Sequence, residues 1–158
     1  MDIDKRNQLL TILLGIIIIG MSYWLYRSLV DPYQEVIEER EMVDRERHRM
    51  EVARDALVQY RNRKGMFPPT EGGLDSLVAF LKTDSIMVAR GEELFAFRPP
   101  STYSPDSVIY SPRPPFNRFE YEVNDTLRPP LYLLENPGSD DRIGDLRNTR
   151  MLNAPNWN

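Results

Sequence analysis

The chain has 158 residues, a formal net charge of −4, 13 prolines, no cysteine and a single histidine, His48. This length suits about one domain of ordinary size. Without cysteine there are no disulfides, thiolate zinc sites or cysteine nucleophiles, and one histidine argues against a catalytic triad or a histidine-rich metal site. The acidic balance argues against a protein that tracks nucleic-acid phosphates, which needs a basic surface.

The apolar residues are concentrated near the start of the chain. The eighteen residues from Leu9 to Tyr26 carry no charge. Extended to Val30 as an α-helix, this segment is about 33 Å long, enough to cross a bilayer, and its terminal aromatic rings suit the headgroup layer. We therefore predict a cytoplasmic N-terminus over residues 1–8 and a transmembrane anchor over residues 9–30, represented by Leu9, Leu13, Ile16, Ile19, Tyr23 and Trp24.

The flanking charges predict the orientation of this anchor. Lys5 and Arg6 precede the apolar run, whereas acidic residues follow it from Asp31 onward. The asymmetry favours a single-pass protein with its N-terminus inside and the remainder outside the cytoplasm. A signal peptide cleaved after Ser22 is the alternative, but the apolar run continues through Tyr26, beyond that point, which favours an uncleaved anchor.

Residues 31–64 are predicted to form a long charged helix. Acidic and arginine residues alternate there at helical spacings, which is typical of a solvated face, and His48 is expected to be solvated among them. A coiled coil is the competing interpretation, although Glu39 and Glu46 occupy the second heptad position. The first heptad position is apolar at Val36, Val43, Met50 and Leu57.

Beyond residue 64 the sequence predicts a small α+β region. Gly65 and the Phe67-Pro68-Pro69 run end the long helix, and a short second helix follows over residues 74–81. Ten of the thirteen prolines lie between Pro99 and Pro155, which excludes long helices there. Short β-prone runs lie between these prolines, at 94–97, 108–110, 119–123 and 131–134.

These runs predict the fold class. Arg-Pro-Pro recurs at residues 98–100, 113–115 and 128–130, and we interpret these copies as breaks between successive strands, with a proline-rich recognition motif as the alternative. The expected fold is α+β, with a transmembrane helix continuing into a long helix packed on an antiparallel sheet of about four strands. The α+β region would cover residues 65–135, and a polar C-terminal segment residues 136–158.

Residues 56–78 resemble the signature of the major pseudopilin of type II secretion systems. That family has Ala-Leu-x-x-Tyr, then Gly-x-Tyr/Phe-Pro, then Thr-Glu-x-Gly-Leu-x-x-Leu-Val. The matching residues here are Ala56, Leu57, Tyr60, Gly65, Phe67, Pro68, Thr70, Glu71, Gly73, Leu74, Leu77 and Val78. The resemblance implies a type IV pilin-like fold in which these residues pack the long helix onto the remainder of the domain.

The start of the chain departs from this family. A prepilin leader ends in a glycine just before the apolar run, whereas MDIDKRNQLLTILL has none. We therefore expect a pilin-like domain on a permanent anchor, without prepilin processing.

One acidic loop is a candidate calcium site. In the resembling family the loop after the last strands can bind calcium, and Asp140 and Asp141 are the corresponding candidates here. Carboxylate oxygens are ligands that calcium prefers, and Glu135, Ser139 and Asp145 are further oxygen donors nearby. A solvated acidic turn, with Arg142 competing for the carboxylates, is the alternative.

No pattern in the sequence predicts catalysis, and no other cofactor is expected. The predicted function is that of a membrane-anchored, pseudopilin-like structural or assembly protein of the bacterial cell envelope, tied to secretion or to a larger complex. The alternative is an accessory or adaptor subunit of an unrelated membrane complex. Expected partners are the lipid bilayer and other envelope or secretion proteins, with self-association included and nucleic acid excluded.

Overall fold

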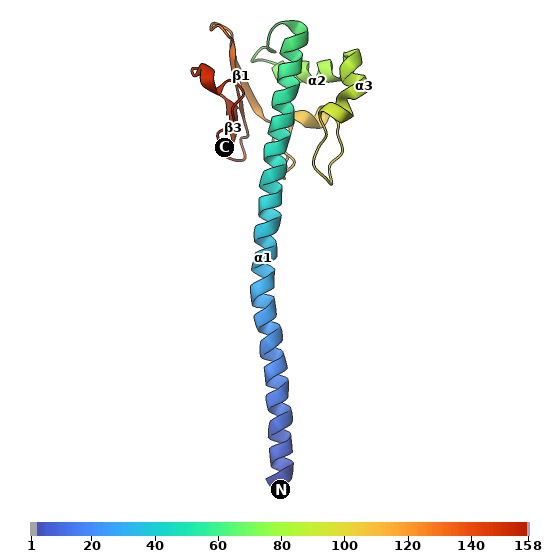
Figure 1. Cartoon of the computed structure of the whole chain (residues 1–158), viewed down its shortest axis with the longest axis vertical. Helices are drawn as coiled ribbons and strands as arrows, with labels where there is room; N and C mark the ends of the chain where they lie inside the picture. The colour runs from blue at the N-terminus through green and yellow to red at the C-terminus, as the bar shows by residue number, and fades with distance from the viewer. Residues whose placement is uncertain (1–2, 158) are drawn as a thin grey trace. The chain divides into compact units, whose positions relative to one another are not determined.

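The computed structural model describes residues 3–157. Residues 1–2 and 158, at the ends of the predicted cytoplasmic N-terminus and C-terminal segment, lie outside the described residues. The chain divides into two compact units, Met1–Glu41 and Met42–Asn158. Helix α1, Ile3–Lys64, contributes residues to both units (Figure 1).

The first unit consists of the apolar part of α1. An 18-residue window there has a mean hydropathy of 2.1 and none of it is buried, so α1 is long and apolar enough to cross a membrane. Each side chain chosen to represent the anchor is more than half exposed: Leu9, Leu13, Ile16, Ile19, Tyr23 and Trp24.

In the second unit α1 is amphipathic. Met50, Ala53, Ala56 and Leu57 are completely buried and recur at helical spacing, so they form one apolar stripe. The helix ends at Lys64 because Gly65 adopts a positive φ of 79°, which favours glycine, and its N–H donates to the carbonyl of Arg61 at 2.7 Å.

Two short helices follow, α2 (Gly73–Thr83) and α3 (Ser85–Leu94). Helix α3 begins at an N-cap, because the Asp84 carboxylate accepts hydrogen bonds from the N–H groups of Ile86 and Met87 at 3.0 and 3.2 Å. The predicted strand at 94–97 is therefore wrong. Leu94 is the last residue of α3, and residues 95–97 have no regular secondary structure.

The sheet has three antiparallel strands in the order β1-β2-β3, which are Glu120–Asn124, Leu131–Glu135 and Arg142–Gly144. The prediction of about four strands is corrected accordingly. The run at 108–110 falls largely in a 3₁₀ helix, η1 (Pro105–Ile109). Val108 and Ile109 are still buried, so their apolar character reflects the core and not a strand. Strand β3 lies within the segment predicted to be a polar C-terminal extension.

Other segments line both edges of this sheet. At the outer edge of β1, the Thr70 hydroxyl accepts from the N–H of Val123 at 3.1 Å. Beside β3, the N–H of Gly144 donates to Ala154 O and the N–H of Asn156 donates to Arg142 O, both at 3.0 Å. A second 3₁₀ helix, η2 (Thr149–Met151), precedes this C-terminal stretch.

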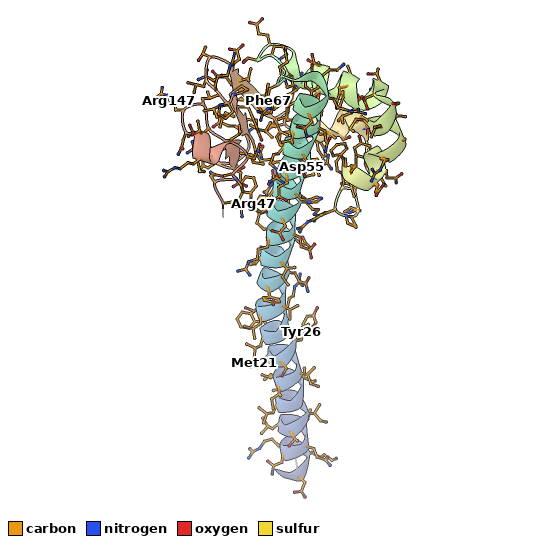
Figure 2. All side chains as sticks on the ribbon, turned by 45° about the horizontal axis from the view of Figure 1, so that its top comes forward. Met21, Tyr26, Arg47, Asp55, Phe67 and Arg147 are labelled. Atoms are coloured by element: carbon orange, nitrogen blue, oxygen red, sulfur yellow. The ribbon has the colours of Figure 1, made fainter. Side chains whose placement is uncertain are left out.

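The core of the second unit surrounds the C-terminal part of α1. In Figures 1 and 2 the sheet lies on one side of this part of the helix, and α2 and α3 lie on the other. The stripe on α1 contributes to a single cluster with residues from all of these elements, including Leu77, Phe80, Phe95, Tyr132, Leu134 and Ile143.

Candidate functional site

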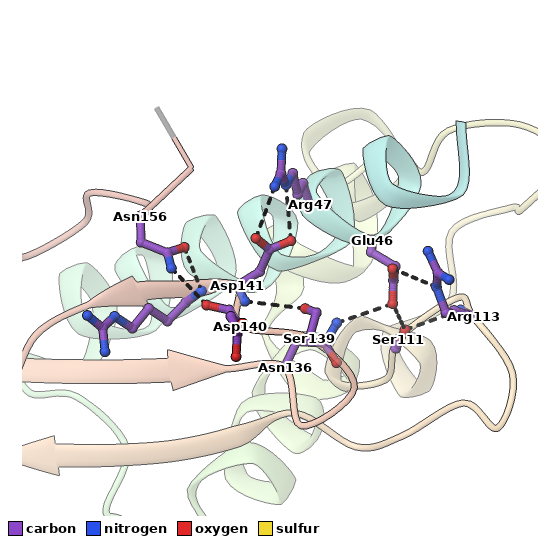
Figure 3. Close-up of polar contacts among 10 residues, drawn as sticks. Glu46, Arg47, Ser111, Arg113, Asn136, Ser139, Asp140, Asp141 and Asn156 are labelled. Atoms are coloured by element: carbon purple, nitrogen blue, oxygen red, sulfur yellow. Dashed lines mark hydrogen bonds and ion pairs between the residues drawn. The ribbon is translucent and has the colours of Figure 1, made fainter. Parts of the chain in front are cut away.

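A buried carboxylate on α1 is the centre of a polar network. Glu46 is only 3% exposed. Its Oε1 accepts hydrogen bonds from Ser111 Oγ at 2.9 Å and Asn136 Nδ2 at 3.2 Å, and its Oε2 accepts from Arg113 Nε at 2.8 Å (Figure 3). A buried charge is tolerated when it is paired and hydrogen-bonded. Glu46 therefore links two loops, far apart in sequence, to α1.

The next residue of α1 makes a second ion pair to one of these loops. The Nε and Nη2 atoms of Arg47 donate to the two carboxylate oxygens of Asp141 at 3.0 and 3.1 Å, a bidentate arrangement (Figure 3). The hydrogen bonds with Asp141 raise the pKa of Arg47 above its ordinary value. The Arg47 guanidinium also lies 5.4 Å from the ring centroid of Trp157, so it contacts the C-terminal segment as well.

This ion pair bears on the predicted calcium ligands. Both oxygens of Asp141 are bonded to Arg47, and the carbonyl of Asp140 accepts from Asn156 Nδ2 at 2.7 Å. The competing arginine comes from α1 and is not Arg142. Within residues 3–157 no three His, Cys, Asp or Glu side chains are grouped so that they could hold a metal ion. A calcium ion at Asp141 would have to displace Arg47, so we base no function on it.

Arg49, a third charged side chain of α1, is buried and has no acidic partner among the described residues. Arg49 is 6% exposed; its Nη1 donates to Ser107 O at 2.7 Å, and its Cζ lies 3.4 Å from the ring centroid of Phe97. Burial lowers the pKa of the Arg49 guanidinium to about 10, so it remains protonated at neutral pH. No carboxylate of the described residues forms an ion pair with it.

His48 contacts the segment after α3 as well as solvent. It is half-buried, and its Nε2 lies 2.9 Å from the carbonyl of Ala96. Since a carbonyl only accepts, the Nε2 must carry the proton. His48 thus stays partly exposed to solvent, and it helps to fix the segment after α3 against α1.

The residues of the family-like motif lie at the junction of α1, α2 and the sheet. Ala56, Leu57 and Leu77 are completely buried, and Leu74 is nearly so. Tyr60 packs edge-on against Phe80 with 5.2 Å between ring centroids.

The turn between α1 and α2 contacts two strands. Phe67 lies 4.9 Å from Tyr132, centroid to centroid, and the Pro68 carbonyl accepts from the Tyr121 hydroxyl at 2.9 Å. Gly73 fits closely there, because a Cβ on it would lie 3.1 Å from Tyr121 Cε1. Thr70 completes the turn through its contact with β1. These residues hold the core together.

The burial of Glu46 was not predicted, although the sequence contains a signal for it. Glu46 lies four residues before Met50 and seven before Ala53, so it falls on the apolar stripe of α1. A charge on such a stripe indicates a buried partner. The partners themselves come from loops whose positions no local pattern fixes.

No family model, curated protein or solved structure matches this chain. The resemblance of residues 56–78 to the major pseudopilin thus stays a prediction.

Proposed function

We propose that the chain is a single-pass membrane protein of the bacterial cell envelope with a pseudopilin-like structural or assembly function. The observation that carries the proposal is the apolar, exposed first part of α1, where an 18-residue window of mean hydropathy 2.1 has no buried residue. Burying one Leu or Ile side chain gains about 1.5–3 kcal/mol. A helix that is apolar on all sides therefore needs a bilayer or a protein partner around it.

The second unit supports a structural role. Two charged side chains of α1, the buried Glu46 and the partly exposed Arg47, pair with loops and hold the unit together. A long helix that packs on a small antiparallel sheet agrees with the type IV pilin-like arrangement that the motif at residues 56–78 implies. In this proposal α1 anchors the chain with its N-terminus inside, and the second unit contacts envelope partners outside the cytoplasm.

Membrane extraction tests the anchor. We expect the full chain to stay in the membrane pellet after alkaline carbonate treatment, and the double variant Ile16→Arg, Ile19→Arg to be released, because each arginine at the centre of a membrane helix costs about 2.5–3.5 kcal/mol. The matched control is Val88→Arg, which places an arginine on an equally exposed apolar position of α3 (Val88 is 63% exposed). Release of the unmodified chain by carbonate, or an intact mass lacking about 22 N-terminal residues, would refute the anchor.

Purification in a gentle detergent tests the assembly role. Because the chain has no cysteine, a single Val36→Cys variant reports only contacts of that exposed position. Disulfide-linked dimers of this variant in membranes would support self-assembly, as a pseudopilin-like role requires. A defined set of other co-purifying chains without such dimers would favour the adaptor function. A lone monomer in both measurements would contradict assembly altogether.

A further inference from the structure

A hollow of about 400 Å³ lies beside the unpaired guanidinium of Arg49. Hydroxyl side chains supply much of its polar lining, and an exposed aromatic ring, Phe116, borders it. No acidic side chain of the described residues lines it. The lining includes Arg49, Ser101, Thr102, Ser107, Ser111 and Phe116.

Arg49 has more hydrogen-bonding capacity than the chain uses. A guanidinium carries five N–H donors, and the described residues accept one bond from it, at Ser107 O. The contact with the Phe97 ring satisfies no N–H. Burying a cation without a counter-charge is costly, and buried charges in proteins are therefore usually paired.

The neighbouring Glu46 does not neutralise the positive charge of Arg49. Glu46 lies one turn before Arg49 on α1, but its carboxylate is bonded to Arg113. The one positive charge of Arg49 is therefore not balanced by an acidic partner among the described residues. The hydroxyl of Ser111, which lines the hollow, donates to Glu46 and accepts from the N–H of Arg113, so it supplies no donor to a ligand there.

We propose that the hollow beside Arg49 binds one carboxylate group, from either a small organic acid or an acidic residue of a partner protein. The planar guanidinium fork matches a carboxylate in geometry, and its one positive charge balances one negative charge. Ser101 and Thr102 are further donors, and Phe116 offers an apolar surface to the carbon chain of the ligand. A phosphate dianion would call for a second unpaired cation, which the lining lacks. This inference does not depend on the proposed function.

The test is a titration of the full chain in detergent micelles, followed by the ¹H–¹⁵N signal of the Arg49 side-chain Nε–H at constant ionic strength. The probes are butyrate, a blocked Gly-Glu-Gly peptide, phosphate and chloride. We expect saturable shifts of this signal with butyrate, the peptide or both, at millimolar concentrations. A response to butyrate alone identifies a small acid as the source, and a response to the peptide alone identifies a protein partner. Shifts with phosphate or chloride that equal those with both carboxylates would overturn the proposal, as would no shift at all.

Substitutions at Arg49 and Thr102 test whether the bound carboxylate lies in the hollow. In Arg49→Met, we expect the butyrate-dependent rise in melting temperature to disappear, with affinity reduced about tenfold or more, because the charged hydrogen bonds are lost. The matched control is Arg61→Met, since Arg61 is on the same helix and lies over the Phe67 ring at 5.1 Å but outside the hollow. An unchanged response in Arg49→Met overturns the site.

Should Arg49→Met not fold, Thr102→Glu replaces it. This variant places a carboxylate of the chain itself at the hollow, so we expect a higher melting temperature than that of the unmodified chain and no further rise with butyrate. A full butyrate response in Thr102→Glu, or a lower melting temperature without added acid, would refute the proposal.

Discussion

Residues 3–41 and 42–64 belong to one helix, but the first stretch exposes its large side chains and the second stretch buries several of its own. The first stretch is the more apolar, and its large side chains are exposed, with Ile19 at 72%. The second stretch is rich in charge, and it buries Leu57 completely and Glu46 almost completely. Apolar composition therefore does not identify the core of this chain. What decides burial is whether other segments contact the helix, and these contact residues 42–64.

The largest expected effect separates the two stretches directly. Leu57→Ala should lower the free energy of unfolding of the second unit by about 2–5 kcal/mol, because it leaves a cavity in the core. Leu13→Ala, which removes the same atoms from an exposed position, should leave it unchanged. Urea unfolding of the full chain in a non-ionic detergent, followed by near-ultraviolet circular dichroism, measures both. Equal losses would show that the first stretch also supports the core.

A smaller effect is expected from the buried charge. Glu46→Ala should cost about 2 kcal/mol, because Arg113 and Asn136 lose their acceptor; we take a low value since the Arg113 side chain is 31% exposed. Glu38→Ala, an exposed glutamate of the same helix, should change the free energy by less than about 0.5 kcal/mol. The same urea experiment compares them. If Glu46→Ala were as harmless as the control, the polar network would not contribute to stability.

The smallest effect concerns acid stability. Desolvation is the largest single influence on Asp84 and raises its pKa, but the N–H groups of Met87 and Ile86 and the charge of Arg63 together outweigh it and hold the pKa below the ordinary 3.8. A carboxyl group with a lowered folded-state pKa stabilises the protein above its ordinary pKa, and this contribution is lost as the pH falls through the folded-state value.

The variant Asp84→Asn isolates this contribution. Asparagine caps a helix about as well but cannot pair with Arg63, so the melting temperature should be slightly lower than that of the unmodified chain at pH 7, and its fall below pH 4 should be less steep. Glu122→Gln, at an exposed strand position, is the matched control. Melting temperatures measured against pH check the prediction, and identical acid profiles for Asp84→Asn and the unmodified chain would contradict it.

The sequence predicted those elements whose signals are local. The continuous helix, the helix at Gly73–Thr83 and the strands Glu120–Asn124 and Leu131–Glu135 follow from periodicity and from the glycine and proline breaks. Helix α3 was missed although Asp84-Ser85 is a fair start signal, because most of its apolar residues are consecutive, from Ile86 to Ala89, and show no helical period. Strand β3 has three residues and one large apolar side chain, too little for a period of two to be recognised.

The candidate site was much less predictable. Phe95 and Phe97 are as apolar as strand residues, yet they are buried on a segment without strand pairing, with Phe97 over Arg49. The interaction of Arg47 with Asp141 joins residues 94 positions apart, and no spacing rule connects them. A helix face shows that a charge will be buried. Only the tertiary fold shows which loop supplies the partner of that charge.

Both outer edges of the sheet are bonded by other segments of the chain, and this affects whether strands of two copies can pair. A protein held in a membrane shares two dimensions with its copies and so reaches a high local concentration. Open strand edges would then invite pairing between copies and aggregation. Here Thr70 takes the free backbone groups of Val123, and residues 154–156 run beside β3. A strand from a second copy would have to displace one of them before it could pair with the sheet.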